Sequence, residues 1–373
     1  MFKITHKDKK TNARIGILST KKGKIETPFF MPVATKATAK YINPKQLEEL
    51  NAKAIISNSL ILHLSPGEKI IKKLGGIGKF MNWNFINVTD SGGFQMYSPS
   101  IYLKSNDNGV FFKNPINGKK LFITPEKNME IQLDINSDIA MTLDSMPLYE
   151  NSKKEIENSV EKTSLWAEKC KKHHDKLQSK ISKNKRQLLF GITQGGIYLD
   201  LRKKSIENLK QLNFDGYSIG GLGLGETKKE ELEIIKLQKS LIPNKPCYLM
   251  GIGSPVEILE AISLGVDMFD SRMPTQNARR GTLFTSKGKL KILNKKYEKD
   301  KYPIDKNCNC FVCKNYSRAY IRFLLKQEEP VGKELASYHN LYYLQDLIQK
   351  AKKEIKKENF LKFKNKISKT YKE

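Results

Sequence analysis

Long apolar runs are missing from this chain of 373 residues. No window of eighteen apolar residues exists, so the sequence predicts no membrane-spanning helix. The first residues, Met1-Phe2-Lys3-Ile4-Thr5, lack the apolar core of a secretion signal. We therefore expect a soluble protein of the cytoplasm.

Cysteine is scarce, and three of the five cysteines lie between Cys308 and Cys313. Such clustering argues against a disulfide framework and is typical of a metal site. The spacing is Cys-x-Cys-x₂-Cys, with Cys310 in the middle, and His339 is the only histidine after residue 174. Three thiolates and one imidazole complete a tetrahedral zinc shell with no open position, which predicts a structural ion. The alternative, buried free thiols, fits poorly with the polar segment 305–309.

Acidic residues are few relative to basic ones, with 39 Asp and Glu against 67 Lys and Arg, and the formal net charge is +28. A surface this basic attracts polyanions such as nucleic acid. Lysine greatly outnumbers arginine and is spread along the whole chain. A genome-wide preference for lysine would also explain part of the basic excess. Charge alone therefore favours nucleic-acid binding without requiring it.

Internal repeats and low-complexity linkers are also absent, so we expect one unit over residues 1–373. Short apolar runs recur, and most are followed by turn residues and a helical pattern. The eight runs are 29–33, 54–57, 85–89, 139–143, 188–193, 217–219, 247–250 and 266–269. Eight such runs predict an α/β fold of the (β/α)₈ barrel type. A small zinc-binding subdomain, residues 282–340, would be embedded after the last strand.

Helical patterns fill the gaps between these runs. They cover 44–50, 66–74, 125–133, 153–177, 201–212, 228–241 and 255–264. We expect His173 and His174, in the lysine-rich helical pattern 153–177, to lie at the surface. Residues 100–124 predict a hairpin around 114–118, and a second hairpin is expected around Gly288. From Leu341 onward the pattern is an amphipathic helix.

Carboxylates and glycines follow several of the predicted strands. In a barrel the carboxyl ends of the strands meet at one mouth, which would bring Asp90, Asp144, Gln194, Asp270 and the pair Gly220-Gly221 together. Such acids suit glycosyl transfer, because one carboxylate can attack an anomeric carbon while another moves a proton. The glycine run 220–225 would also suit a phosphate loop, but it lacks the lysine of that motif.

The segment 266–284 joins one of these acids to a group of cations. Asp270 ends an apolar run, and a proline turn is followed by arginines that suit a polyanion. Arg272, Arg279 and Arg280 are the candidates. The simpler interpretation is a strand end closed by a turn.

Taken together, the chain resembles the tRNA-guanine transglycosylases of the bacterial type, also called queuine tRNA-ribosyltransferases. The motifs that carry the resemblance are Thr-Pro-Phe-Phe-Met-Pro-Val at 27–33, Asp-Ser-Gly-Gly-Phe-Gln at 90–95, Gly-Gly-Leu at 220–222, Phe-Asp at 269–270 and the cysteine cluster. They span nearly the whole chain.

The resemblance implies a catalytic pair. Asp270 would be the nucleophile at the ribose C1′, giving a covalent intermediate between the enzyme and tRNA, and Asp90 would be the general acid and base. Arg272, Arg279 and Arg280 would hold phosphates without reading sequence.

The resemblance also implies a set of residues that bind the base. They are Ser91, Phe94, Asp144, Gln194, Gly220, Gly221, Leu222, Glu226 and Met250. Asp144 would accept hydrogen bonds from N1 and the exocyclic amine, while Gln194 and the Gly221 amide would address O6. The Leu222 carbonyl and Glu226 would face the 7-substituent. Phe94 and Met250 would sandwich the flipped base.

The implied reaction is the exchange of guanine at the wobble position of tRNA with a GUN anticodon for a 7-deazaguanine, preQ1 or queuine, in queuosine biosynthesis. One structural zinc per subunit and a homodimer are also implied. Archaeal members of the family act elsewhere in tRNA and usually carry an added C-terminal RNA-binding domain. The sequence shows no such domain, so we expect the anticodon loop to be the target.

Departures from the family pattern concern the rim of the expected site. Met146 stands where cysteine is common and bears on the selectivity of the base pocket. Gln276 replaces a usual arginine, Arg272 a usual apolar residue, and Leu60 and Ile61 a tyrosine-histidine pair.

Two other functions compete with this reading. A non-catalytic RNA-binding partner subunit should have lost the acids, and Asp90, Asp144 and Asp270 are all present. A retaining glycosidase would not explain the cysteine cluster and the basic surface.

Overall fold

Eight parallel strands form the centre of the protein. The computed structural model describes residues 2–371, so Met1, Lys372 and Glu373 of the predicted 1–373 unit lie outside the described residues. The strand order is β4-β14-β13-β12-β11-β10-β6-β5. The strands are β4 (Phe29–Pro32), β5 (Ala54–Asn58), β6 (Ile86–Asp90), β10 (Ile139–Met141), β11 (Leu188–Thr193), β12 (Gly216–Ile219), β13 (Cys247–Leu249) and β14 (Met268–Ser271). All eight overlap the predicted runs, and β14 lies two residues later than predicted, so Asp270 is within the strand rather than after it.

The sheet closes on itself between its first and last strands. A parallel bridge joins Val33 to Ile56, and the Ala34 amide donates to the Ile56 carbonyl at 2.7 Å. The (β/α)₈ barrel predicted from the sequence is therefore confirmed. Closure leaves no free edge on the central sheet.

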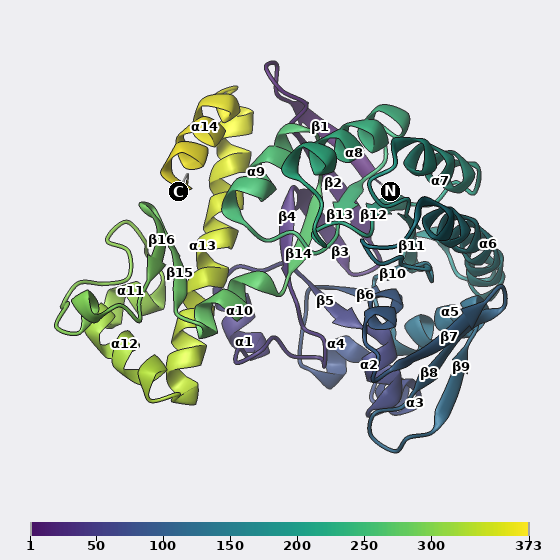
Figure 1. Cartoon of the computed structure of the whole chain (residues 1–373), viewed down its shortest axis with the longest axis horizontal. Coiled ribbons are helices and arrows are strands. Elements are labelled where there is room, and N and C mark those ends of the chain that lie inside the picture. The colour runs from purple at the N-terminus through teal and green to yellow at the C-terminus, as the bar shows by residue number, and fades with distance from the viewer. Residues whose placement is uncertain (1, 372–373) are drawn as a thin grey trace.

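Helices cover the outside of the barrel (Figure 1). They are α1 (Pro44–Glu49), α2 (Ser59–Leu64), α3 (Glu68–Lys73), α4 (Ile77–Phe80), α5 (Pro125–Ile135), α6 (Lys153–Leu177), α7 (Leu199–Gln211), α8 (Lys228–Leu241), α9 (Pro255–Ser263) and α10 (Met273–Arg279), with 3₁₀ turns η1 (Gly93–Tyr97) and η2 (Lys183–Lys185). Their starts are encoded locally. Thr124 caps α5 ahead of a proline, and Ser152 and Thr227 form capping boxes on α6 and α8.

Strand alternation divides the core into an inner and an outer part. Phe29 and Met31 of β4 pack inside the barrel with Val88 and Met268, whereas Phe30 packs outside among the helices. Side chains two residues apart on a strand share a face, so each inward apolar residue predicts the direction of the residue two positions later.

A three-stranded antiparallel sheet closes the amino-terminal end of the barrel. It consists of β1 (Phe2–Lys7), β2 (Arg14–Thr20) and β3 (Gly23–Thr27). Leu18 and Ile25 join the inner core, and Arg14 forms a buried ion pair with Asp267 at 2.5 Å. The opposite end of the barrel is therefore the open mouth.

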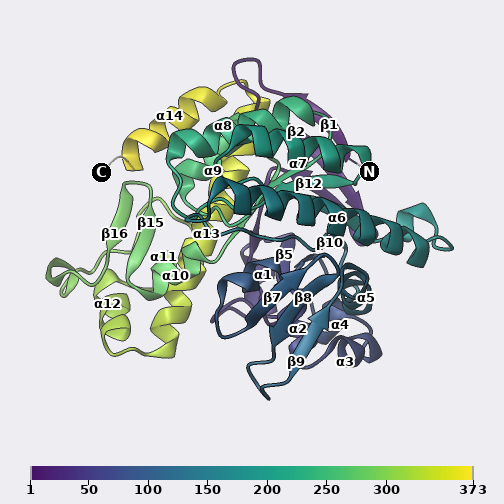
Figure 2. The same ribbon diagram turned by 45° about the vertical axis from the view of Figure 1, so that its right-hand side comes forward.

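An inserted sheet follows β6 and lies far from the N-terminal strands (Figure 2). It comprises β7 (Tyr102–Asn106), β8 (Gly109–Lys113) and β9 (Lys120–Ile123). The expected hairpin around 114–118 joins β8 to β9. A second hairpin, turning at Asp107 and Asn108 between β7 and β8, was not predicted.

Residues 282–371, about a quarter of the chain, form a lobe that includes a long helix (Figure 1). It contains β15 (Thr282–Thr285), β16 (Gly288–Lys291), η3 (Lys295–Tyr297), α11 (Phe311–Asn315), α12 (Arg318–Lys326), α13 (Pro330–Lys356) and α14 (Phe360–Tyr371). The hairpin around Gly288 is confirmed. The last long helix begins at Pro330 rather than at Leu341, because proline occupies its first turn and Leu335 is already buried.

Among residues 2–371, no helix is both long enough and apolar enough to span a membrane.

Candidate active site and metal site

The predicted site residues lie at the open mouth of the barrel. Side chains alternate between the two faces of a strand, and this alternation places them on the inner face. Asp90 comes two residues after the inward Val88, and Asp270 two residues after the inward Met268. Gln194 follows the inward Ile192 by the same step. These side chains therefore share the inner face at the carboxyl ends of their strands.

Asp270 is held through one of its two carboxylate oxygens. The Tyr248 hydroxyl donates to Oδ1 at 2.6 Å, and the Gly251 amide donates to the same atom at 2.9 Å. No described residue is hydrogen-bonded to Oδ2. Burial raises the pKa of Asp270 above the usual value for a carboxyl. Because Oδ2 has no protein partner among the described residues, it is the oxygen available to act as a nucleophile.

Asp90 lies in the electric field of Asp270 and accepts hydrogen bonds from the neighbouring strand end. The Asn58 side chain donates to Oδ2 at 2.8 Å, and the Ser59 amide donates to Oδ1 at 3.3 Å. Burial raises the pKa of Asp90 to about 7, and the charge of Asp270 adds to this rise. A carboxyl with this pKa can both give and take a proton near neutral pH.

Asp144 forms the wall next to these two acids. Its Oδ1 accepts from the Ser91 hydroxyl at 2.8 Å, and its Oδ2 accepts from the Gln194 amide at 2.7 Å. Burial raises the pKa of Asp144. A Cβ atom at Gly93 would lie 2.1 Å from Asp144 Oδ1, so the close approach of the two segments requires glycine there.

The loop after β12 supplies the other wall. Gly221 has a φ of +67°, a conformation that favours glycine, and Leu222 beside it is buried. Glu226 accepts hydrogen bonds from the amides of Gly223 and Leu224, the latter at 3.0 Å. Gly221 and Glu226 line a cavity of about 30 Å³.

The two residues expected to sandwich a base differ in exposure. Phe94 is 47% exposed and stacks on Tyr97 of η1, with 5.6 Å between the ring centroids. Met250, directly after β13, is half-buried against the inner core. Gln194 has a buried Oε1 without a hydrogen-bond partner among the described residues, which leaves an acceptor at this site for a ligand.

The three predicted phosphate contacts are divided between the two ends of α10. Arg272 precedes the helix and is exposed, whereas Arg279 and Arg280 end it. Arg279 is half-buried over the Tyr41 ring at 5.9 Å, and its Nη1 has no hydrogen-bond partner among the described residues. The seven residues of α10 separate Arg272 from Arg279 and Arg280 by about 10 Å. The three arginines can therefore contact two separate phosphates rather than one.

Sequence reasoning missed residues that position this site. Tyr248 donates to Asp270, and Asn58 donates to Asp90. Both lie at inward strand positions, where a polar side chain in the sequence could have indicated a role in the site. Arg202 was also missed, although it shares the buried face of α7 with Ser205 and Leu209.

The prediction that His174 lies at the surface is wrong. His174 is buried, and its ring hydrogen-bonds to Gln187 at 3.1 Å and to Gln178. The lysines around it in sequence obscured the fact that it lies on the inner face of α6 together with Cys170.

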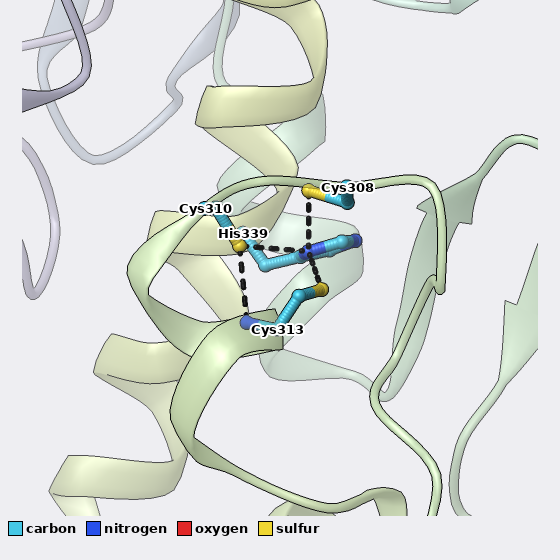
Figure 3. A group of neighbouring side chains, drawn as sticks. All are labelled: Cys308, Cys310, Cys313 and His339. Atoms are coloured by element: carbon cyan, nitrogen blue, oxygen red, sulfur yellow. Dashed lines mark hydrogen bonds between the residues drawn. The ribbon is translucent and has the colours of Figure 1, made fainter.

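The cysteine cluster converges on His339, which lies in α13 (Figure 3). Its Nδ1 lies 3.9 Å from Cys308 Sγ, 3.5 Å from Cys310 Sγ and 3.4 Å from Cys313 Sγ. In a tetrahedral zinc shell the S to N separation is about 3.6 Å. The predicted ligands therefore form a group that can hold a metal ion.

The second ring nitrogen of His339 is fixed by the hairpin of the lobe. Nε2 lies 2.7 Å from the Phe284 carbonyl oxygen, to which it donates when protonated. This bond leaves Nδ1 unprotonated and directed at the three thiols, as metal-binding histidines require. The four donors leave no position for a substrate.

Comparison with known proteins agrees with this geometry. The family model of queuine tRNA-ribosyltransferase matches residues 8–373. Queuine tRNA-ribosyltransferases from Thermoanaerobacter sp. (strain X514), Halothermothrix orenii and Lysinibacillus sphaericus are 47%, 45% and 47% identical to the chain. Each alignment covers 99% of this chain and 96–97% of the relative. The chain belongs to the queuine tRNA-ribosyltransferase family.

Proposed function

We propose that this protein exchanges guanine in the anticodon of tRNA for a 7-deazaguanine base. The observation that carries the proposal is the meeting of Asp90 and Asp270 at one barrel mouth beside a wall suited to a purine edge. Family membership supports the same reaction class.

The first half of the reaction removes guanine. Asp270 Oδ2 attacks the ribose C1′, and the C1′–N9 bond breaks with its electron pair passing to the base. Protonated Asp90 gives a proton to the departing guanine. Because its pKa is about 7, about half of the molecules carry this proton at that pH. The product is a covalent aspartyl ester of the RNA ribose.

The second half reverses these steps with a new base. The Asp90 carboxylate takes the N9 proton of the incoming 7-deazaguanine, whose N9 then attacks C1′. The ester bond to Asp270 breaks, and its electron pair returns to the carboxylate. Two displacements at one carbon preserve the configuration of the ribose.

The purine is recognised along the wall that runs from Ser91 to Gly221. Asp144 accepts hydrogen bonds from N1 and the exocyclic amine, in place of its present donors. The Gln194 side-chain amide, released from Asp144, and the Gly221 N–H donate to O6. The Leu222 carbonyl faces the 7-substituent. The small cavity beside Glu226 is the place for that substituent.

The remaining base contacts come from the rim. Phe94 and Met250 sandwich the flipped base, and Gly220 lets the backbone come close to it. Arg272, Arg279 and Arg280 hold phosphates of the RNA. The basic surface supplies the non-specific part of the affinity.

The metal group would hold a structural zinc ion, one per subunit, and residues 282–340 would form an embedded subdomain of a one-barrel chain. The ion would tie the β15–β16 hairpin to α13 and take no part in the reaction. Metal analysis should find one zinc per chain, and Cys310→Ser should lose it. The matched variant Cys170→Ser, at a buried cysteine outside the cluster, should retain it.

The assembly and substrate follow the family. We propose a cytoplasmic homodimer that acts on tRNA with a GUN anticodon, with preQ1 or queuine as the incoming base. Competition between the two bases against labelled guanine would identify the preferred one. Met146, two residues after Asp144, is the residue to exchange in that comparison.

Incubating GUN tRNA with radiolabelled guanine tests the proposed reaction. Label should enter the wobble position with the wild-type protein. Failure of label to enter, with an active family member as control, would favour the alternative of a non-catalytic RNA-binding subunit.

A further inference from the structure

Arg202 is a buried cation behind the proposed base pocket. It lies on α7, is 0% exposed, and forms no ion pair with any described residue. All four of its hydrogen bonds go to backbone carbonyls. Nε donates to Gly196 O at 2.8 Å, and Nη1 donates to Thr193 O at 3.2 Å and Gly220 O at 2.9 Å. Nη2 donates to Gly221 O at 3.4 Å.

The charge of Glu226 acts on Arg202 and opposes the effect of burial, but the two side chains form no ion pair. A buried charge without an ion-pair partner is costly, so its retention needs a reason. Burial lowers the pKa of Arg202 to about 10, which still leaves it charged at neutral pH. The other buried arginine with several carbonyl partners, Arg14, has Asp267 as its counter-ion. A purely structural role, in which Arg202 joins the loops of Gly196 and Gly220, would need only neutral donors. Such a role does not explain why the side chain is charged.

The hydrogen bond to Gly220 O connects this charge to the base pocket. The Gly220 carbonyl and the Gly221 N–H belong to one peptide group. A cation at the oxygen draws electron density from the nitrogen, which makes the N–H a stronger donor, as in other hydrogen-bonded chains. The Gly221 N–H is the donor assigned to O6 of the purine.

We propose that Arg202 is a positioning residue that polarises the Gly220–Gly221 peptide and thereby strengthens the Gly221 N–H as a donor to O6; this proposal rests on the proposed base exchange. When the C1′–N9 bond breaks, negative charge spreads over the departing guanine, including O6. A preorganised donor backed by a buried cation stabilises that charge without rearrangement.

Guanine and 6-thioguanine provide the test, because they differ only in the acceptor at position 6. Inhibition constants of both bases are measured against tRNA guanine exchange, for wild type, Arg202→Gln and Arg202→Lys. The wild type should favour guanine by about tenfold, the scale of one hydrogen bond strengthened by charge. Arg202→Gln keeps a neutral donor and should lose most of this preference, with kcat falling as well as KM rising. Arg202→Lys keeps the charge and should retain more of both.

Arg14→Lys is the matched control, since it alters a buried arginine at the other end of the barrel and should leave the preference unchanged. An Arg202→Gln protein with the wild-type preference for guanine would overturn the proposal. Equal binding of the two bases by the wild type would also overturn it, and this measurement does not depend on the folding of a variant. These outcomes differ from failure of the base exchange itself, in which the wild type would incorporate no guanine at all.

Discussion

The two ends of the barrel use buried aspartates in opposite ways. Asp267 and Asp270 are three residues apart on the same strand segment, but one faces the closed end and the other the open mouth. Asp267 is fully buried and ion-paired with Arg14. Asp270 has a tyrosine and an amide as partners and no cation, and burial raises its pKa. Removing one partner of a buried ion pair destabilises a fold, whereas a buried carboxylate without a cation has the raised pKa that is common at functional sites.

The largest expected effect separates these aspartates by activity. Asp270→Asn removes the attacking oxygen and should lower guanine exchange by about 10⁴-fold or more, the scale seen when a nucleophile is lost. Asp267→Asn, assayed where the protein is folded, should retain exchange within about threefold, because it touches no substrate in the proposed reaction. Similar losses in both variants would erase the distinction between the two ends.

The second prediction concerns Asp90 and pH. With a pKa of about 7, Asp90 is protonated below that pH and loses its proton above it. In the proposed reaction the removal of guanine needs the acid form of Asp90, so kcat/KM for that step should fall as pH rises above about 7. Asp90→Asn should lower the rate by about 10²- to 10⁴-fold and abolish this limb of the profile. An unchanged limb in the variant would assign it to another group.

The third prediction separates the two aspartates by stability. Asp267→Asn leaves Arg14 buried without its counter-ion and should lower the free energy of unfolding by about 3–5 kcal/mol, measured by urea denaturation. Asp270→Asn should leave this free energy unchanged or raise it, because an unpaired buried carboxyl is relieved. A stabilising effect at Asp267 or a large loss at Asp270 would reverse the comparison.

The smallest expected effect lies at the rim of the mouth. Phe94→Ala should raise KM by about tenfold through loss of base stacking, with little change in unfolding because the ring is 47% exposed. Phe80→Ala, at a 40% exposed phenylalanine of α4, is the matched control and should leave KM unchanged. Equal KM values for the two variants would remove Phe94 from the base site.

The sequence predicted the barrel because its strands are short buried runs, most of them followed within two residues by glycine or an acid, and their ends meet by topology alone. The ligand group around His339 was predictable for a different reason, because few other donors were available in the chain. The second hairpin at Asp107 was missed although residues 106–109 are all turn formers, because one hairpin around 114–118 was taken to account for the whole segment 100–124.

Partners in space were harder to predict than positions on strands. Nothing in the local pattern pairs Tyr248 with Asp270, because the contact crosses between neighbouring strands. His174 was misplaced because its lysine-rich neighbours suggested a solvated helix, although one face of that helix is buried. Arg202 was hidden for the same reason: a charge on an otherwise apolar face is visible only once the face is known.

Asp270, in the proposed reaction, forms a covalent bond to the ribose of tRNA. Wild-type protein incubated with GUN tRNA, denatured and analysed by electrophoresis and mass spectrometry, should contain an RNA adduct on the peptide that carries Asp270. The adduct should disappear on addition of guanine before denaturation and be absent from Asp270→Asn. A denaturant-stable adduct in Asp270→Asn, or one located on another peptide of the wild type, would contradict the account.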